Sequence, residues 1–161
     1  MALQQTLVLV KPDGVARGLT GNVIKRIEKI GLKIIGLKLV KIDSDFSKKH
    51  YAAHVDKEFY KGLEKFILSG PVVAMVIEGV DAIENIRKLA GATESKSALP
   101  GTIRGDFSHV SYSHADERGI AVKNIIHASG DVSDAEKEVA LWFSIDELHS
   151  YKRAGESHLL E

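Results

Sequence analysis

The segment Thr6-Leu-Val-Leu-Val-Lys-Pro-Asp-Gly14 (TLVLVKPDG) contains the clearest structural signal in the sequence. Its first five residues are apolar or β-branched, and this pattern predicts a buried strand over 6–10. The Lys-Pro-Asp-Gly tetrapeptide that follows is a turn signal and ends the strand. The chain therefore begins with an interior strand, and the segments after it determine the layers that surround it.

Periodicity predicts the elements that follow this strand. Apolar residues recur at helical spacing from Leu19 to Ile30, with Gly31 as a stop signal, and the imperfect alternation over 32–42 is typical of a long strand with one solvated face. Asp81 with Glu84, and Ser133 with Glu136, have the spacing of capping boxes at helix starts. The remaining predicted elements are helices over 47–54, 57–68, 81–90 and 133–143, and strands over 72–77 and 120–126.

Alternation of strands and helices predicts one α/β sandwich, with helices covering one face of a sheet. The strand order stays open, because the pattern suits both a split βαβ arrangement of the ferredoxin-like type and a small parallel sheet. The segment 91–119 is long, polar and without a sustained period, which is typical of a functional loop.

Composition excludes several classes of protein. The 161 residues contain 22 basic and 22 acidic side chains, so the overall charge gives no reason to expect nucleic acid or an anionic membrane as partner. The absence of cysteine excludes thiolate metal sites and thiol redox chemistry, and fits a reducing compartment. No apolar run approaches a secretory signal or a membrane span. We therefore expect a cytoplasmic protein.

Glu138 is the most unusual residue in the pattern. At about 100° per residue, it falls inside the apolar stripe of its helix, close to Trp142 and Ala135. A carboxylate there needs a partner, because burying it alone is costly. His127 is the nearest candidate and follows an apolar strand, so the two would form a base or nucleophile and its orienting carboxylate. The alternative is a solvated Glu138 at the helix edge and a structural His127.

Three basic residues lie at or just beyond the ends of predicted elements. Lys11, Arg87 and Arg104 are candidates for one anion site, because guanidinium groups suit phosphate oxygens. Solvated surface charge is the alternative for each of them. The sequence has no Gly-x-x-x-x-Gly-Lys-Ser/Thr motif, which excludes a P-loop.

The other histidines give weaker signals. His50 and His54 are four residues apart, which is a metal-binding spacing, but a solvated helix face explains them better. A second group in the long loop could bind a divalent ion, although loop solubility explains it equally well. That group consists of His109, His114, Asp116 and Glu117.

Four motifs together carry a family resemblance. They are Lys11-Pro-Asp-Gly-Val15, Gly91-Ala-Thr93, Pro100-Gly-Thr-Ile-Arg104-Gly-Asp106 and Asn124-Ile-Ile-His127-Ala-Ser129. With these motifs in this order, the chain resembles the nucleoside diphosphate kinase family from about Thr6 to Trp142. The resemblance implies transfer of the γ-phosphate of a nucleoside triphosphate, usually ATP, to a nucleoside diphosphate through a phosphohistidine. It also implies a ping-pong cycle that needs Mg²⁺.

The resemblance also implies a role for each matched residue. His127 is expected to be the nucleophile, with Glu138 as its carboxylate partner and Ser129 as the neighbour that bonds to that carboxylate. Lys11 is expected to reach the γ-phosphate and the sugar 3′-hydroxyl. Residues expected to hold phosphates, ribose and base are Arg87, Thr93, Arg104, Tyr51, Asn124, Phe59 and Leu63, with Ala121 opposite the base. No protein ligand is expected for Mg²⁺, which phosphates and water would hold.

At the level of the molecule, the resemblance implies a ferredoxin-like fold with a four-stranded antiparallel sheet covered by helices. It implies one nucleoside diphosphate kinase-like domain over 1–161, assembled as a homohexamer or alternatively a tetramer. This sequence departs from the family by an insertion at about 108–119, by Ala128 and Gly130 beside the histidine, and by its tail after Phe143. The insertion is expected to shape nucleotide access or a subunit contact.

Two other functions remain as alternatives. A nucleotide-sensing or nucleic-acid-binding module would keep the pocket without turnover, but a nucleic-acid binder should carry a basic stripe that this balanced sequence lacks. A protein that donates phosphate from histidine to other proteins would share the chemistry and require a partner surface.

Overall fold

One layer of four strands forms the centre of the molecule. The computed structural model describes residues 3–160, and its strands are β1 (Gln4–Val10), β2 (Lys33–Val40), β3 (Val72–Gly79) and β4 (Ile126–Ala128). Their order in the sheet is β2-β3-β1-β4, and every neighbouring pair is antiparallel. The expected four-stranded antiparallel sheet is therefore present.

This order resolves the open question of topology. Because β1 and β2 both pair with β3, they run in the same direction with another strand between them. The connection from β1 to β2 passes through a helix, which makes it a split βαβ unit of the ferredoxin-like fold. The alternative of a small parallel sheet is wrong.

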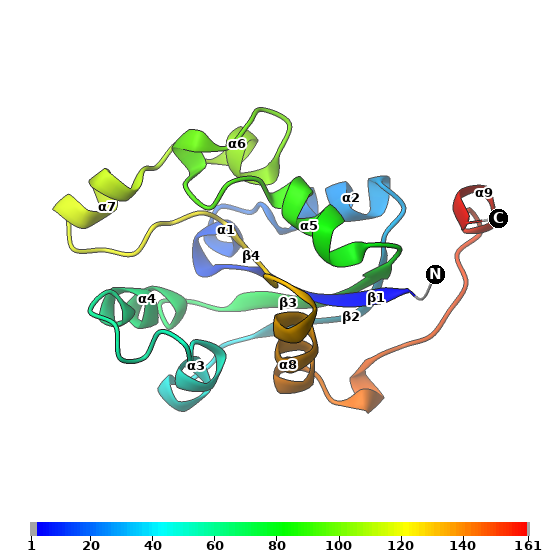
Figure 1. Ribbon diagram of the computed structural model, residues 1–161, viewed down its shortest axis with the longest axis horizontal. Coiled ribbons are helices and arrows are strands. Elements are labelled where there is room, and N and C mark those ends of the chain that lie inside the picture. Colours follow the sequence, from blue (N-terminus) through cyan, green and yellow to red (C-terminus); the bar gives the residue numbers. More distant parts are fainter. Residues whose placement is uncertain (1–2, 161) are drawn as a thin grey trace.

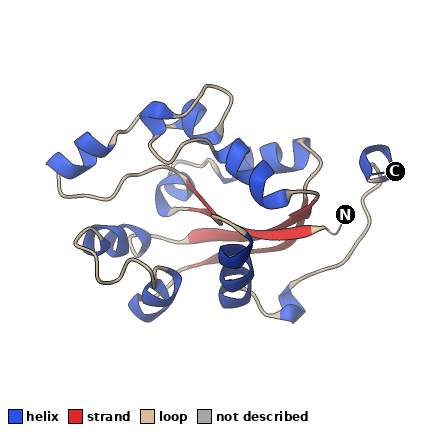
Figure 2. Ribbon diagram, in the orientation of Figure 1, coloured by secondary structure: helices blue, strands red, loops and turns tan. Residues whose placement is uncertain are grey.

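Helices pack on both faces of the sheet, as Figures 1 and 2 show. The elements α2 (Thr20–Lys29), α5 (Ala82–Ala90) and α6 (Ile103–Phe107) lie on one face. The elements α3 (Ser44–His50), α4 (Tyr60–Ile67) and α8 (Val132–Trp142) lie on the other. The short remaining elements are α1 (Pro12–Ala16), η1 (Ser95–Ser97), α7 (Tyr112–Glu117), η2 (Ile145–Glu147) and α9 (Ser157–Leu160).

The prediction that helices cover only one face is wrong. In β1, Val8 and Val10 face the cluster under α2 and α5, while Leu7 and Leu9 face the cluster under α4 and α8. All four side chains are fully buried. Continuous apolar runs are typical of strands covered on both sides, and the run over 6–10 is such a pattern.

The last strand lies later in the sequence than predicted. The apolar stretch 120–126 indicated a strand, but β4 begins at Ile126 and includes His127. The reason is the length of its partner, because β1 ends at Val10, which lies opposite Ile126. Residues before 126 run past the end of the sheet and have no strand to pair with.

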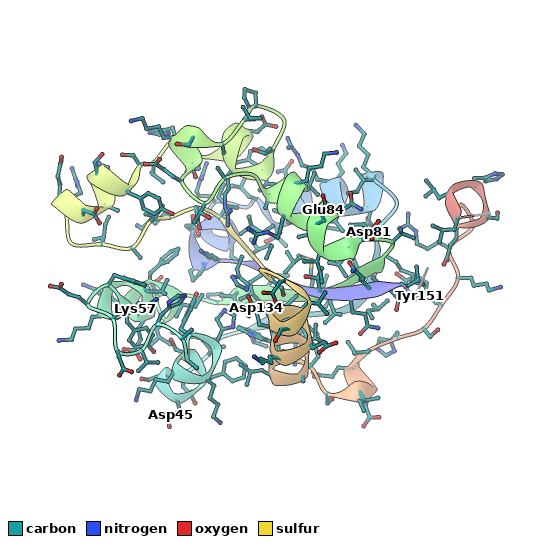
Figure 3. The ribbon with its side chains drawn as sticks, viewed as in Figure 1. Asp45, Lys57, Asp81, Glu84, Asp134 and Tyr151 are labelled. Atoms are coloured by element: carbon teal, nitrogen blue, oxygen red, sulfur yellow. The ribbon has the colours of Figure 1, made fainter. Side chains whose placement is uncertain are left out.

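Both predicted capping boxes are wrong. Asp81 precedes α5 with a left-handed φ of 48°, and its side chain caps nothing. At α8 the cap is Asp131, whose carboxylate accepts the backbone N–H of Asp134 at 2.9 Å, so Ser133 lies inside the helix. Asp134 is labelled at this first turn in Figure 3. The helix therefore begins one residue earlier than predicted.

The segment 91–119 is not without secondary structure, since it contains η1, α6 and α7. The tail after α8 follows the edge of β2, where the His149 N–H donates to the carbonyl of Ile35 at 2.8 Å. The Tyr151 hydroxyl, on the side chain labelled in Figure 3, donates to the carbonyl of Ile34 at 2.7 Å. Within residues 3–160, no helix is long and apolar enough to cross a bilayer.

Candidate active site

The structure brings His127 and Glu138 together. His127 lies in β4 opposite Leu9 of β1, and Glu138 lies in the second turn of α8. Nε2 of His127 is 2.9 Å from Oε1 and 3.0 Å from Oε2 of Glu138. The side chains keep 21% and 15% of their surface exposed. The helical wheel therefore placed Glu138 correctly, facing inward with a partner.

Ser129 completes a chain of hydrogen bonds on the same carboxylate. Its hydroxyl donates to Oε2 of Glu138 at 2.6 Å and accepts the backbone N–H of Leu7 at 3.2 Å. Burial by itself raises the pKa of the Glu138 carboxyl, but the hydrogen bonds from His127 and Ser129 outweigh it and leave this pKa below its usual value. Glu138 is therefore ionised at neutral pH.

The ionised carboxylate fixes the tautomer of His127. A carboxylate only accepts hydrogen bonds, so Nε2 of His127 must be the donor. In the neutral ring the lone pair then resides on Nδ1. The arrangement leaves the lone pair of Nδ1 available at the edge of the sheet.

A second polar group lies at the end of β1. The Lys11 side chain is buried, and its Nζ donates to Oδ1 of Asn124 at 2.7 Å. Nδ2 of Asn124 donates in turn to the backbone carbonyl of Thr93 at 2.7 Å. Burial, with the charge of Arg104 as a smaller cause, lowers the pKa of Lys11 to about 8. A lysine in this state gains charge stabilisation when an anion approaches.

Arg104 on α6 is held by three backbone carbonyls. Nε donates to the carbonyl of Asn124 at 3.2 Å, Nη1 to that of Gly91 at 2.9 Å, and Nη2 to that of Ile126 at 2.6 Å. A guanidinium has five N–H groups, so two remain for a ligand. Burial, and to a smaller extent the charge of Arg87, lower the pKa of Arg104 to about 10, so it stays cationic at pH 7.

Arg87 and Thr93 border this group from the exposed side. Arg87 lies in the last turn of α5, and both side chains are exposed. The charge of Arg87 is a minor cause of the lowered pKa of Arg104. The three expected cations, Lys11, Arg87 and Arg104, therefore surround one region that favours an anion with several oxygens.

Sequence reasoning missed the turn that precedes the histidine. Ile125 has a φ of 71°, which is a strained conformation for a β-branched residue. Its N–H donates to Oδ2 of Asp13 at 3.0 Å, and its carbonyl accepts the N–H of Lys11 at 2.7 Å. These contacts hold β4 against the end of β1. No residue type in the sequence signals this turn, because Ile is the residue least expected there.

The expected base-binding residues lie on and beside α4. Phe59 immediately precedes α4 and is 56% exposed, and Leu63 follows one turn later. The chain at Ala121 passes close to the same helix, since a Cβ added to Gly62 would lie 3.5 Å from the nitrogen of Ala121. An exposed aromatic ring with an apolar neighbour offers a stacking platform for a base.

Tyr51 lies one residue beyond α3 and is buried. Its hydroxyl has no hydrogen-bond partner among the described residues. Burial, then the charge of Glu138, raise the pKa of this phenol, so it remains protonated. An unpaired buried hydroxyl next to an anion site is a donor available to a ligand.

The interpretation of His50 and His54 as a solvated helix face is wrong for His50. The helix α3 ends at His50, and this ring packs at a centroid distance of 4.9 Å from His127. The signal that could have found it is its position directly before the buried Tyr51.

Among residues 3–160, only His50, His127 and Glu138 form a group with possible metal-ligand atoms within 4.8 Å of one another. The possible divalent-ion group of His109, His114, Asp116 and Glu117, for which loop solubility was the alternative, is not assembled in the described part of the chain. Trp142 donates its indole N–H to Nδ1 of His50 at 3.1 Å, which uses the lone pair of the neutral ring. In this state His50 is not a metal ligand.

Comparisons with known proteins agree with this geometry. The family model described as nucleoside diphosphate kinase matches residues 4–148. The nucleoside diphosphate kinase of Borreliella burgdorferi is 47% identical over 161 residues, covering 97% of this chain and 96% of that protein. The nucleoside diphosphate kinase of Pyrococcus abyssi is 50% identical over 151 residues, covering 94% and 91%.

A solved structure is equally similar. It is described as a transition-state mimic of nucleoside diphosphate kinase from Borrelia burgdorferi with bound vanadate and ADP. It superimposes with a TM-score of 0.93 at 46% identity and covers 97% of this chain and 96% of that one. With a family model across most of its length and relatives near half identity, the chain belongs to the nucleoside diphosphate kinase family.

Proposed function

We propose that this protein transfers the terminal phosphoryl group of a nucleoside triphosphate, usually ATP, to a nucleoside diphosphate in two steps through His127. The observation that carries the proposal is the contact of 2.9 Å between Nε2 of His127 and Glu138. Because this contact fixes the proton on Nε2, the lone pair of Nδ1 is free beside a group of cations.

Each of the two steps forms one bond to phosphorus and breaks another. In the first, the lone pair of Nδ1 forms a bond to the γ-phosphorus, the bond from that phosphorus to the bridging oxygen breaks, and the nucleoside diphosphate leaves with the electron pair. In the second, a terminal oxygen of an acceptor diphosphate attacks the same phosphorus, and the electron pair of the N–P bond returns to Nδ1. Glu138 and Ser129 stabilise the ring in both steps.

The phosphates would be held by the cations at the ends of β1, α5 and α6. The two unused N–H groups of Arg104, the exposed guanidinium of Arg87 and the Nζ of Lys11 would meet the negative oxygens, where charge accumulates in the transition state. The Thr93 and Tyr51 hydroxyls would donate to the same oxygens. The relative with vanadate and ADP bound supports this assignment by its similarity.

Enzymes of this family need a divalent cation, and we propose Mg²⁺. The donors described here fit an ion held by phosphate and water rather than by protein, because Glu138 already bonds to His127 and Ser129, and Oδ2 of Asp13 bonds to Ile125. When bound, Mg²⁺ neutralises phosphate charge. The residues of this chain would hold the nucleotide that carries it.

The nucleoside would lie between α4 and the chain at 120–121. Phe59 would stack on the base, Leu63 and Ala121 would contact its edges, and Asn124 would contact the ribose. A ring face accepts any base, which supports a broad nucleotide range.

We further propose a cytoplasmic homo-oligomer, a hexamer with a tetramer as the alternative, with residues 1–161 as one domain and 108–119 as an insertion. Leu37 and Leu39 on the edge strand β2 are 52% and 62% exposed, which supports a subunit contact there. The absence of cysteine supports a reducing compartment.

Initial-rate kinetics test the proposal. With ATP as donor and dTDP as acceptor, the two-step cycle predicts parallel double-reciprocal lines, and His127→Ala should abolish transfer while ADP still binds. Lines that intersect, or full turnover by His127→Ala, would contradict it.

A further inference from the structure

His50 has no role in the transfer described above, yet its ring lies against the nucleophile. Its centroid is 4.9 Å from that of His127, and the two ring planes meet at 81°. The rings of Tyr51 and Trp142 enclose it at 4.5 Å and 5.4 Å. Three aromatic neighbours at steep angles leave the imidazole of His50 little freedom to turn.

Trp142 determines the tautomer of this ring. An indole N–H only donates, so the hydrogen bond of 3.1 Å makes Nδ1 of His50 the acceptor. In the neutral ring the proton is then on Nε2. Trp142 is itself fixed at the end of α8 by the edge of Phe46, with ring centroids 4.7 Å apart.

Burial keeps His50 neutral. Desolvation, with the neighbouring His127 as a smaller cause, lowers the pKa of His50 to about 3. Its Nε2 is shielded from solvent and has no hydrogen-bond partner among the described residues. The ring therefore accepts one hydrogen bond from Trp142 and leaves its own N–H unpaired beside His127, so its orientation there needs a reason beyond filling the core.

The task follows from the way in which His127 is held. Glu138 fixes Nε2, while the bond between Cβ and Cγ connects the ring to β4. The torsion about this bond is broad for histidine, because it joins an sp³ and an sp² atom. A small rotation about the bond between Cβ and Cγ moves Nδ1, which lies off the axis of this bond. A perpendicular ring beside His127 limits such rotations.

We propose that His50, with its orientation fixed by Trp142, is a positioning residue that holds the ring plane of His127 so that Nδ1 meets the phosphorus in line. This inference rests on the proposed function, since it concerns the attack by Nδ1. It assigns no proton transfer and no phosphate contact to His50. Misalignment of a nucleophile is costly in rate even where binding is unaffected.

Two substitutions distinguish the contribution of the His50 ring from that of its hydrogen bond with Trp142. His50→Gln keeps an acceptor for Trp142 and removes the ring, whereas His50→Phe keeps an aromatic edge against His127 and removes the acceptor. His149→Phe is the matched control, because His149 is exposed and lies on the segment beside β2. Each variant is assayed as the full chain, by single-turnover labelling with γ-labelled ATP and by calorimetric titration with ADP.

We expect His50→Gln to slow labelling by about 10- to 100-fold and His50→Phe by less than about tenfold, with ADP affinity within about twofold of wild type. His149→Phe should label at the wild-type rate. Rescue of the rate by an aromatic ring, at constant affinity, distinguishes positioning from a general structural role.

A spectroscopic measurement gives a second readout. In ¹⁵N spectra of histidine, His50 should show a protonated Nε2 throughout neutral pH, and Trp142→Phe should lead to a mixture of tautomers. His127 should keep its proton on Nε2 in every His50 variant, because Glu138 is unchanged. A His50 ring that is protonated on Nδ1 in the wild type would overturn the inference.

The kinetic outcomes distinguish the two proposals. If the wild type is labelled and both His50 variants are labelled at the wild-type rate, the role of His50 is overturned and the proposed function stands. Rate losses that merely follow a loss of melting temperature and of ADP affinity overturn it too. Wild type that takes no label overturns the proposed function together with this inference.

Discussion

In the proposed cycle, Glu138 determines which nitrogen of His127 reacts. Its carboxylate accepts hydrogen bonds from Nε2 of His127 and from the hydroxyl of Ser129, and these donors keep it ionised. The tautomer that results exposes Nδ1. In the proposed cycle, the reactivity of His127 therefore depends on the direction of its hydrogen bond to Glu138.

Glu138→Gln tests this directly. The amide can donate to Nε2 and so favours the wrong tautomer, and we expect labelling of His127 to slow by a factor on the order of 10 to 10³. Single-turnover labelling measures the effect. Glu136→Gln, on the exposed side of α8, is the control and should match wild type. Equal rates for Glu138→Gln and wild type would show that the tautomer does not limit attack.

The protonation state of Lys11 is expected to make the binding of ADP depend on pH. Its pKa of about 8 means that the free protein loses this charge as the pH rises through that value. Since the protonated form favours phosphate, the dissociation constant for ADP should rise above pH 8 by up to about tenfold per pH unit. Titration calorimetry from pH 7 to 10 checks this. Lys11→Met should flatten the profile, whereas Lys123→Met, at an exposed site, should leave it unchanged.

Some residues of the candidate site could be predicted from the sequence and others could not. Glu138 could be found because a carboxylate inside an apolar stripe violates the helical pattern. His50 could not, because its partner Trp142 is distant in sequence and only the packing of α3 on α8 brings them together. The strained turn at Ile125 depends on Asp13 in the same way.

Elements were predicted where one local pattern dominates. The strands at 6–10 and 32–42 and the helices at 19–30 and 81–90 correspond to β1, β2, α2 and α5. The start of β4 was missed because a distant partner decides it, since β4 begins where β1 can pair with it. The start of α8 was missed for a local reason, because Asp131 caps the helix in place of Ser133. The continuous apolar run over 6–10 is typical of a strand covered on both faces, but the alternation over 32–42 indicated a solvated face and led to the wrong prediction.

The segment 108–119 is expected to affect nucleotide binding. It contains α7, whose first backbone N–H, at Tyr112, donates to the Glu94 carboxylate at 2.9 Å, and it leads into the chain that passes α4 at Gly62. Replacing 109–119 with a short Gly-Ser linker should raise the KM for nucleotides several-fold, because a wall of the proposed base site is displaced. Unchanged KM and unchanged assembly would exclude both expected roles of the segment.

In the molecule as a whole, the helices on one face of the sheet leave part of the edge strand β2 uncovered. Leu37 and Leu39 lie opposite Met75 and Val73 and so share the face that α2 and α5 cover, yet both are largely exposed at the edge strand. Leu39→Glu should therefore weaken subunit contacts and give smaller particles by light scattering. Lys41→Glu, just past the strand, is a control for added charge. An unchanged particle mass for Leu39→Glu would place the interface elsewhere.

In the proposed cycle, the transferred phosphoryl group passes through His127. The most direct test incubates the purified protein with γ-labelled ATP and Mg²⁺, stops the reaction in alkali, and measures acid-labile label before any acceptor is added. We predict label on wild type, none on His127→Ala, and its departure on addition of a nucleoside diphosphate. A wild-type protein that turns over ATP and acceptor without ever carrying label would contradict the claim.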